Sequence, residues 1–214
     1  MNAHFLPDKM MKSVRIIYLF VAGVIIIPLT VFGITTWFGS HFQRLPVLGP
    51  EKHIVGDFSF TDQTGEVISQ KNWAGKIVVA NYFFTSCPSV CPKLMNALQK
   101  VHARGSKHVF INSFTVDPER DSVGKLKIYA DKHRITDGWS LLTGDKISLY
   151  KFARTDLLID ATDGDGGPAD FIHSDRLVLV DPLRQIRGYY NGTDSDDVDR
   201  LIGDIEKLNK EFNL

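Results

Sequence analysis

An uncharged run of 23 residues near the N-terminus, Ile16–Phe38, constrains the fold of this chain more than any other feature. As an α-helix rising 1.5 Å per residue it would be about 35 Å long, enough to cross a hydrocarbon core of about 30 Å. Pro28 lies inside the run, but membrane helices tolerate proline. Because Lys9, Lys12 and Arg15 precede the run, the positive-inside rule predicts a cytoplasmic N-terminus and a larger domain across the membrane.

Two other interpretations of this run are a cleaved signal peptide and a buried helix of a soluble protein. A signal core has about 7–15 apolar residues and ends at a small-x-small cleavage site, which does not follow cleanly here. We therefore expect a single transmembrane signal anchor over residues 16–38, after a cytoplasmic N-terminus over 1–15. The chain has no Arg- and Ser-rich transit segment, which favours a bacterial inner membrane and a periplasmic domain over a mitochondrial location.

The remainder of the chain has the composition of a soluble domain. Residues 39–56 are rich in glycine and proline, which is typical of a linker, so the domain is predicted at 57–214. The chain has 25 basic and 25 acidic side chains, and residues 1–44 contain four of the basic and one of the acidic ones. Residues 45–214 therefore contain 21 basic and 24 acidic side chains and have a net charge of −3. A nucleic-acid partner is not expected, because such proteins carry a basic excess.

Apolar patterns predict strands that alternate with helices along this domain. Two short strands are expected around a turn at Asp62–Gly65, and the segment 155–172 has no clear period. The other expected elements are buried strands at Lys76–Phe84 and His108–Val116, a short strand at Trp139–Leu142, helices at Leu94–Arg104, Ser122–His133, 146–154 and Asp194–Leu214, and a hairpin of Arg176–Val180 with Gln185–Tyr190. This order fits an α/β domain of the thioredoxin-like fold, with a mixed sheet, extra N-terminal strands and one insertion.

The only two cysteines, Cys87 and Cys91, lie four residues apart between a predicted strand and a predicted helix. The positive end of a helix lowers the pKa of a nearby thiol and favours the thiolate, which is both the metal-binding and the redox-active form. Proline is favoured at the first helical position, so Pro92 predicts a regular helix starting near residue 92. An irregular turn over 87–91 would then let the sulfurs meet in a disulfide or open around an ion.

Several functions are compatible with such a pair. The cysteines could be structural, or they could form the redox pair of an extracytoplasmic thiol–disulfide oxidoreductase. A peroxidase of the peroxiredoxin kind is disfavoured, because it needs a threonine three residues before its reactive cysteine and Phe84 stands there. A calcium site over residues 163–166 is also disfavoured, because the spacing of an EF-hand loop is not met.

The motifs around the cysteines resemble those of the SCO/SenC family of membrane-anchored copper proteins. The resemblance runs from about Asp57 to the C-terminus, and the N-terminal anchor matches as well. It rests on Asp57-Phe58 with Thr61-Asp62, Phe83-Phe84 before Cys-Pro-x-x-Cys-Pro, Val116-Asp117-Pro118-Glu119-Arg120-Asp121, and His173-Ser174 before Leu179-Val180-Asp181-Pro182.

This resemblance implies a thioredoxin-like domain that binds one copper ion, Cu(I) or Cu(II), through Cys87, Cys91 and His173. It also implies that the protein prepares the CuA centre of cytochrome c oxidase, with the copper-centre subunit of the oxidase as partner and a copper donor protein upstream. A metallochaperone without turnover is thereby favoured over an enzyme, although some members also reduce disulfides. Ser86 and Ser89 replace a histidine or aromatic and an acid found in many members, which removes charge beside the thiols.

Overall fold

The structure is a computed structural model that describes residues 8–41, 44–51, 53–88, 90–105, 107–159 and 174–214. The chain divides into two units, Met1–Gln43 and Arg44–Leu214.

The described residues of the first unit form one helix, α1, which spans Asp8–His41 and includes Pro28. Its 34 residues correspond to a length of about 51 Å. Within α1, the 20 residues of Ile17–Thr36 have a mean hydropathy of 2.5, and none of this stretch is buried. By length and composition, α1 can therefore cross a membrane, a property that signal sequences share.

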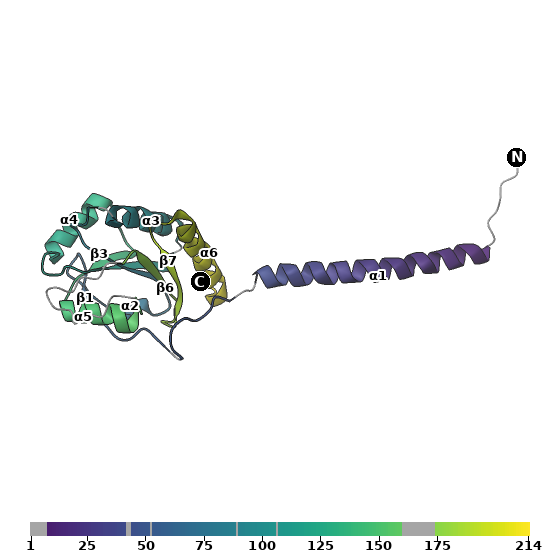
Figure 1. Cartoon of the computed structure of the whole chain (residues 1–214), viewed down its shortest axis with the longest axis horizontal. Helices are drawn as coiled ribbons and strands as arrows, with labels where there is room; N and C mark the ends of the chain where they lie inside the picture. Colours follow the sequence, from purple (N-terminus) through teal and green to yellow (C-terminus); the bar gives the residue numbers. More distant parts are fainter. Residues whose placement is uncertain (1–7, 42–43, 52, 89, 106, 160–173) are drawn as a thin grey trace. The chain divides into compact units, whose positions relative to one another are not determined.

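The second unit is built on a five-stranded mixed sheet in the order β5-β4-β3-β6-β7. Figure 1 labels β3, β6 and β7 of this sheet. The parallel strands β3 (Ile77–Phe83), β4 (Val109–Thr115) and β5 (Trp139–Leu142) are joined by the antiparallel β6 (Arg176–Val180) and β7 (Ile186–Asn191). All seven residues of the central β3 are buried, as expected for an apolar strand covered on both faces. The mixed sheet and the C-terminal hairpin predicted from the sequence are confirmed.

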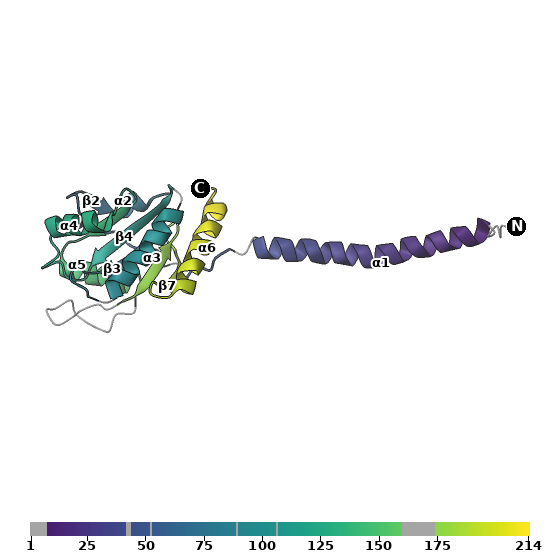
Figure 2. The ribbon, with the colours of Figure 1, turned by 90° about the horizontal axis from the view of Figure 1, so that it is seen from above.

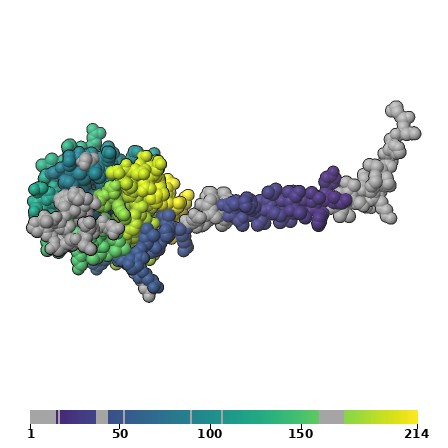
Figure 3. Space-filling model, viewed as in Figure 1, coloured from purple at the N-terminus to yellow at the C-terminus, as the bar shows by residue number. Residues whose placement is uncertain are grey.

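Helices cover both faces of this sheet. One face packs against α3 (Val90–Arg104), α4 (Val123–His133) and α6 (Ser195–Phe212). The helices α3 and α6 lie side by side (Figures 1 and 2), and α6 covers one side of the unit in the space-filling view (Figure 3). The amphipathic pattern of the last segment thus predicted α6 correctly, from its N-cap Asp194 onward.

The opposite face packs against shorter elements. These are the hairpin β1 (Ser59–Thr61) and β2 (Val67–Ser69), the helices α2 (Gln70–Trp73) and α5 (Lys146–Lys151), and a π-helical turn at Phe152–Asp156. The two N-terminal strands are confirmed. The helix expected over 146–154 changes to the π-helical form after Lys151, and α2 was not predicted because its single turn is too short for a periodic pattern.

The segment before β1 packs on the sheet. The Leu48 N–H donates to the Ile186 carbonyl, and the Val55 N–H donates to the Arg184 carbonyl. The compact unit consequently begins at Arg44, although the glycines and prolines of this segment are typical of a linker. These residues form turns and a β-bridge on the surface of the domain, which composition alone does not distinguish from a free spacer.

Candidate metal centre

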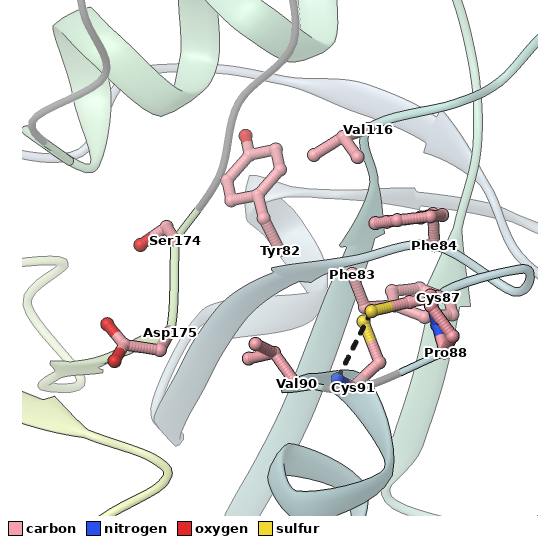
Figure 4. Close-up of a pocket in the computed structure, with 10 residues that line it drawn as sticks. All are labelled: Tyr82, Phe83, Phe84, Cys87, Pro88, Val90, Cys91, Val116, Ser174 and Asp175. Carbon is pink, nitrogen blue, oxygen red and sulfur yellow. Dashed lines mark hydrogen bonds between the residues drawn. The ribbon is translucent and has the colours of Figure 1, made fainter.

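The two cysteines lie where β3 ends and α3 begins, and they share a pocket of about 410 Å³. Aromatic and aliphatic side chains of β3, α3 and Val116 form most of its wall, and Ser174 and Asp175 line the opposite side (Figure 4). Both cysteines are thiols in the structure and contact each other. Two soft sulfur donors are thus held together at the rim of an apolar pocket.

The backbone around the pair is a tight turn that leads directly into α3. The Cys87 N–H donates to the Phe84 carbonyl at 3.3 Å, and the Cys91 N–H donates to Cys87 Sγ at 3.4 Å. The helix begins at Val90, so the predicted start near residue 92 and the irregular turn through Cys91 were wrong by two residues. Pro92 still fits, because the N–H groups of the first helical turn have no partner within the helix.

The protonation of Cys91 also differs from the prediction. Burial raises the pKa of the Cys91 thiol to about 12, and this effect exceeds the lowering by a hydrogen bond with the Phe84 backbone. The prediction that the helix N-terminus favours a thiolate is therefore wrong for Cys91 in the metal-free protein. Cys91 is only 5% exposed, so its charged form would lose its hydration. Deprotonation of Cys91 must be coupled to the arrival of a cation or of another reactant.

This raised pKa predicts slow alkylation of Cys91. In a Cys87→Ser variant, the rate of reaction with iodoacetamide should rise about tenfold per pH unit between pH 7 and 10 without reaching a plateau, because the thiolate fraction is still increasing. Mass spectrometry at several times gives the rate, and unfolded protein in urea is the control. A plateau below pH 9 in the folded protein would contradict the raised pKa.

Charged and hydroxyl side chains from the β4–α4 region hold the turn that carries Cys87. Asp121 accepts hydrogen bonds from Thr85, and Lys125 contacts both Asp121 and Ser86. The sequence reasoning missed these contacts, although Asp121 belongs to one of the motifs that carried the family resemblance. Only the fold shows that this motif reaches the cysteine turn.

His173, the third predicted ligand, lies outside the described residues. The next two residues of the chain, Ser174 and Asp175, line the cysteine pocket (Figure 4). No histidine of the described segments lines this pocket, and no cluster of three or more potential metal ligands is found among the described residues. Among the described residues, the soft metal donors of this pocket are therefore the thiols of Cys87 and Cys91.

The domain matches a known protein family. A family model described as SCO1/SenC matches residues 48–210. A SCO1 protein homolog of Bacillus subtilis strain 168 is 29% identical over 164 residues, which cover 73% of this chain and 83% of that protein.

Solved structures show the same fold. BsSco, described as having a disulfide switch and as a member of the Sco family of cytochrome c oxidase assembly proteins, is 27% identical, with a TM-score of 0.62 over 77% of this chain and 98% of that one. Arabidopsis thaliana ScoI with copper bound is 27% identical, with a TM-score of 0.56 over 73% of this chain and 99% of that one. These likenesses confirm the thioredoxin-like α/β fold predicted from the sequence.

Proposed function

This chain belongs to the SCO1/SenC family, and on that premise we propose that it binds one copper ion and serves in assembling the CuA centre of cytochrome c oxidase. The observation that carries the proposal is the pair of contacting thiols in one apolar pocket, with the chain next to His173 on the opposite wall. Copper as the ion is supported by the copper-bound structure of Arabidopsis thaliana ScoI, and the oxidase as the target is supported by the description of BsSco.

The proposed ligands are Cys87, Cys91 and His173. Thiolates select Cu(I) among the common metal ions, and an imidazole accommodates both Cu(I) and Cu(II), so this set suits either state of copper. The assignment of His173 is supported by its position in the sequence, directly before Ser174, which lines the pocket. Structural zinc usually takes four ligands, a number that these three residues do not reach.

We propose the same membrane arrangement that the sequence predicts. Residues 1–15 would be cytoplasmic, residues 16–38 would span a bacterial inner membrane, and the domain would be periplasmic. The apolar stretch within α1 and the basic residues before it support this topology. The partners would be the copper-centre subunit of the oxidase and a protein that donates copper.

A second candidate function is thiol–disulfide exchange at the same pair, favoured by the contact between the two thiols. In that reaction Cys87 and Cys91 form a disulfide, and the two electrons and two protons that they lose reduce a disulfide of the target to two thiols. This chemistry needs only the two sulfurs and a suitable reduction potential, and the third ligand has no part in it.

The test is an anaerobic Cu(I) titration of the full chain in detergent against a competing chelator. We expect tight one-to-one binding, and we expect His173→Ala to weaken it at least tenfold without changing the oxidation of the dithiol. His102→Ala is the matched control, because that imidazole bonds the Asp137 carbonyl. Unchanged copper binding in His173→Ala would refute the third ligand, and weak binding by the wild type would favour thiol–disulfide exchange.

A further inference from the structure

The turn that carries Cys87 is tied to a buried carboxylate on another part of the chain. Asp121, which is 1% exposed, lies just before α4. One of its oxygens, Oδ2, accepts the Thr85 N–H at 3.0 Å and the Thr115 hydroxyl at 2.7 Å. The other, Oδ1, accepts the Thr85 hydroxyl at 2.5 Å and lies 3.5 Å from Lys125 Nζ. A residue two positions before Cys87 is thus held through both its backbone and its side chain.

Lys125 extends this contact to the residue next to Cys87. Its ammonium group, placed by the first turn of α4, donates to Ser86 Oγ at 3.3 Å while it pairs with Asp121. The Lys125 side chain is 41% exposed, so its own contribution to folding stability is small. The two residues immediately before Cys87 therefore both hydrogen-bond to the Asp121–Lys125 pair.

This arrangement depends on an ionised carboxylate. Each oxygen of Asp121 faces two donors, and an aspartate accepts at both oxygens, whereas an asparagine accepts at one and presents an NH₂ group at the other. The NH₂ group of an asparagine at this position would face the N–H, O–H or ammonium donors that now bind one carboxylate oxygen. These hydrogen bonds would be lost, and part of the turn would be released. The start of α4 does not depend on the Asp121 side chain, because α4 has its own N-cap in Ser122. Outside the cysteine turn and Lys125, Asp121 also accepts the hydroxyl of Thr115 in β4.

We propose that Asp121, with Lys125, is a positioning residue that holds Cys87 in reach of Cys91 for binding copper. The inference deepens the proposed function and rests on it for the identity of the ion. A site whose donors are already held in place binds more tightly, because less motion is lost on binding. The same restraint raises the effective concentration of one thiol at the other, so it also stabilises the Cys87–Cys91 disulfide.

The experiment compares four variants of the full chain in detergent: Asp121→Asn, Thr85→Val, Lys125→Gln and the control Asp181→Asn. Asp181 is a matched control because it is 1% exposed and accepts two backbone N–H groups and an arginine. Asp181 directly follows β6, and the last residue of β6, Val180, pairs with Val78 near the start of β3. Cys87 comes after the opposite end of β3, so the control residue and the cysteine turn lie at opposite ends of this strand. Two properties are measured, the Cu(I) affinity against a chelator and the reduction potential against glutathione.

We expect Asp121→Asn to weaken Cu(I) binding at least tenfold and to lower the stability constant of the disulfide at least tenfold, which raises the potential by about 30 mV. Thr85→Val and Lys125→Gln should each shift both properties in the same direction by about threefold, since each removes one of the contacts. Asp181→Asn should lower thermal stability and leave both properties within twofold of the wild type.

Wild-type affinity and potential in Asp121→Asn would overturn the proposal, as would equal losses in Asp121→Asn and Asp181→Asn. If Asp121→Asn does not fold, Thr85→Val and Lys125→Gln decide, and wild-type values in both would also overturn it. If the wild type itself binds no copper, the proposed function fails, while the reduction potentials still test the role of Asp121.

Discussion

Replacing Cys87 with serine is expected to lower the affinity for Cu(I) by about a thousandfold or more. A serine hydroxyl stays protonated at neutral pH and is a hard oxygen donor, so of the proposed ligands the variant keeps only the Cys91 thiolate and the His173 imidazole. Cys87 is the better thiol to replace because its sulfur accepts the Cys91 N–H at the start of α3. A serine oxygen accepts that bond as well, which preserves the helix start.

Competition with a Cu(I) chelator under anaerobic conditions measures this loss. The double variant Cys87→Ser/Cys91→Ser should be only slightly weaker than Cys87→Ser, because the high-affinity site is already lost with the first thiol. A Cys87→Ser affinity within tenfold of the wild type would contradict the proposed ligand set. Circular dichroism and thermal unfolding provide the control for intact folding.

The affinity should also depend on pH in a defined direction. Cys91 has a raised pKa of about 12, so it is protonated at neutral pH and must lose its proton when a metal ion binds. Copper binding should therefore weaken as the pH falls, by about tenfold per unit for this thiol alone.

Replacing Arg187 with leucine is expected to lower the free energy of unfolding of the domain by about 3–5 kcal/mol. Arg187 is 3% exposed and forms ion pairs of 2.8 Å with Asp181, which is fully buried, and with Glu211 of α6. It also donates to the carbonyl oxygens of Leu45 and Pro46. Without the guanidinium, the Asp181 carboxylate keeps its backbone donors but stays buried without a cation.

Urea unfolding monitored by tryptophan fluorescence measures this change. Arg200→Leu is the control, because Arg200 forms an ion pair with Asp197 that is partly exposed to solvent, and its loss should cost less than about 1 kcal/mol. The double variant Arg187→Leu/Asp181→Leu should recover part of the loss, since it removes the uncompensated charge as well. An Arg187→Leu variant within 1 kcal/mol of the wild type would show that the ion pair is not needed for stability.

The main elements of this protein could be predicted because they depend on local patterns. The buried strand β3 and the amphipathic helix α6 each follow from the order of apolar residues along a short stretch. The cysteine site could be predicted for a similar reason: Cys87 and Cys91 lie four residues apart, at a junction between strand and helix. The predicted third ligand, His173, depended on family resemblance, because a single histidine has no sequence pattern of its own.

The short and irregular elements could not be predicted in this way. The single turn of α2 starts at a capping box formed by Ser69 and Asn72, and the π-helical turn follows α5 without a break in the apolar pattern. The packing of residues 44–56 depends on partners 100 or more positions away, such as the Asp156 side chain that accepts the Gly56 N–H.

The sequence by itself determined which residues form the main strands and helices and which two residues supply the thiols, because these properties are encoded within a few neighbouring positions. Only the tertiary structure decided the protonation of Cys91, the contact of Asp121 with the cysteine turn and the ion pairs of Arg187. Each of these depends on burial or on a partner distant in sequence. Hydration and electrostatic energies follow distances in space, and the order of residues does not specify those distances directly.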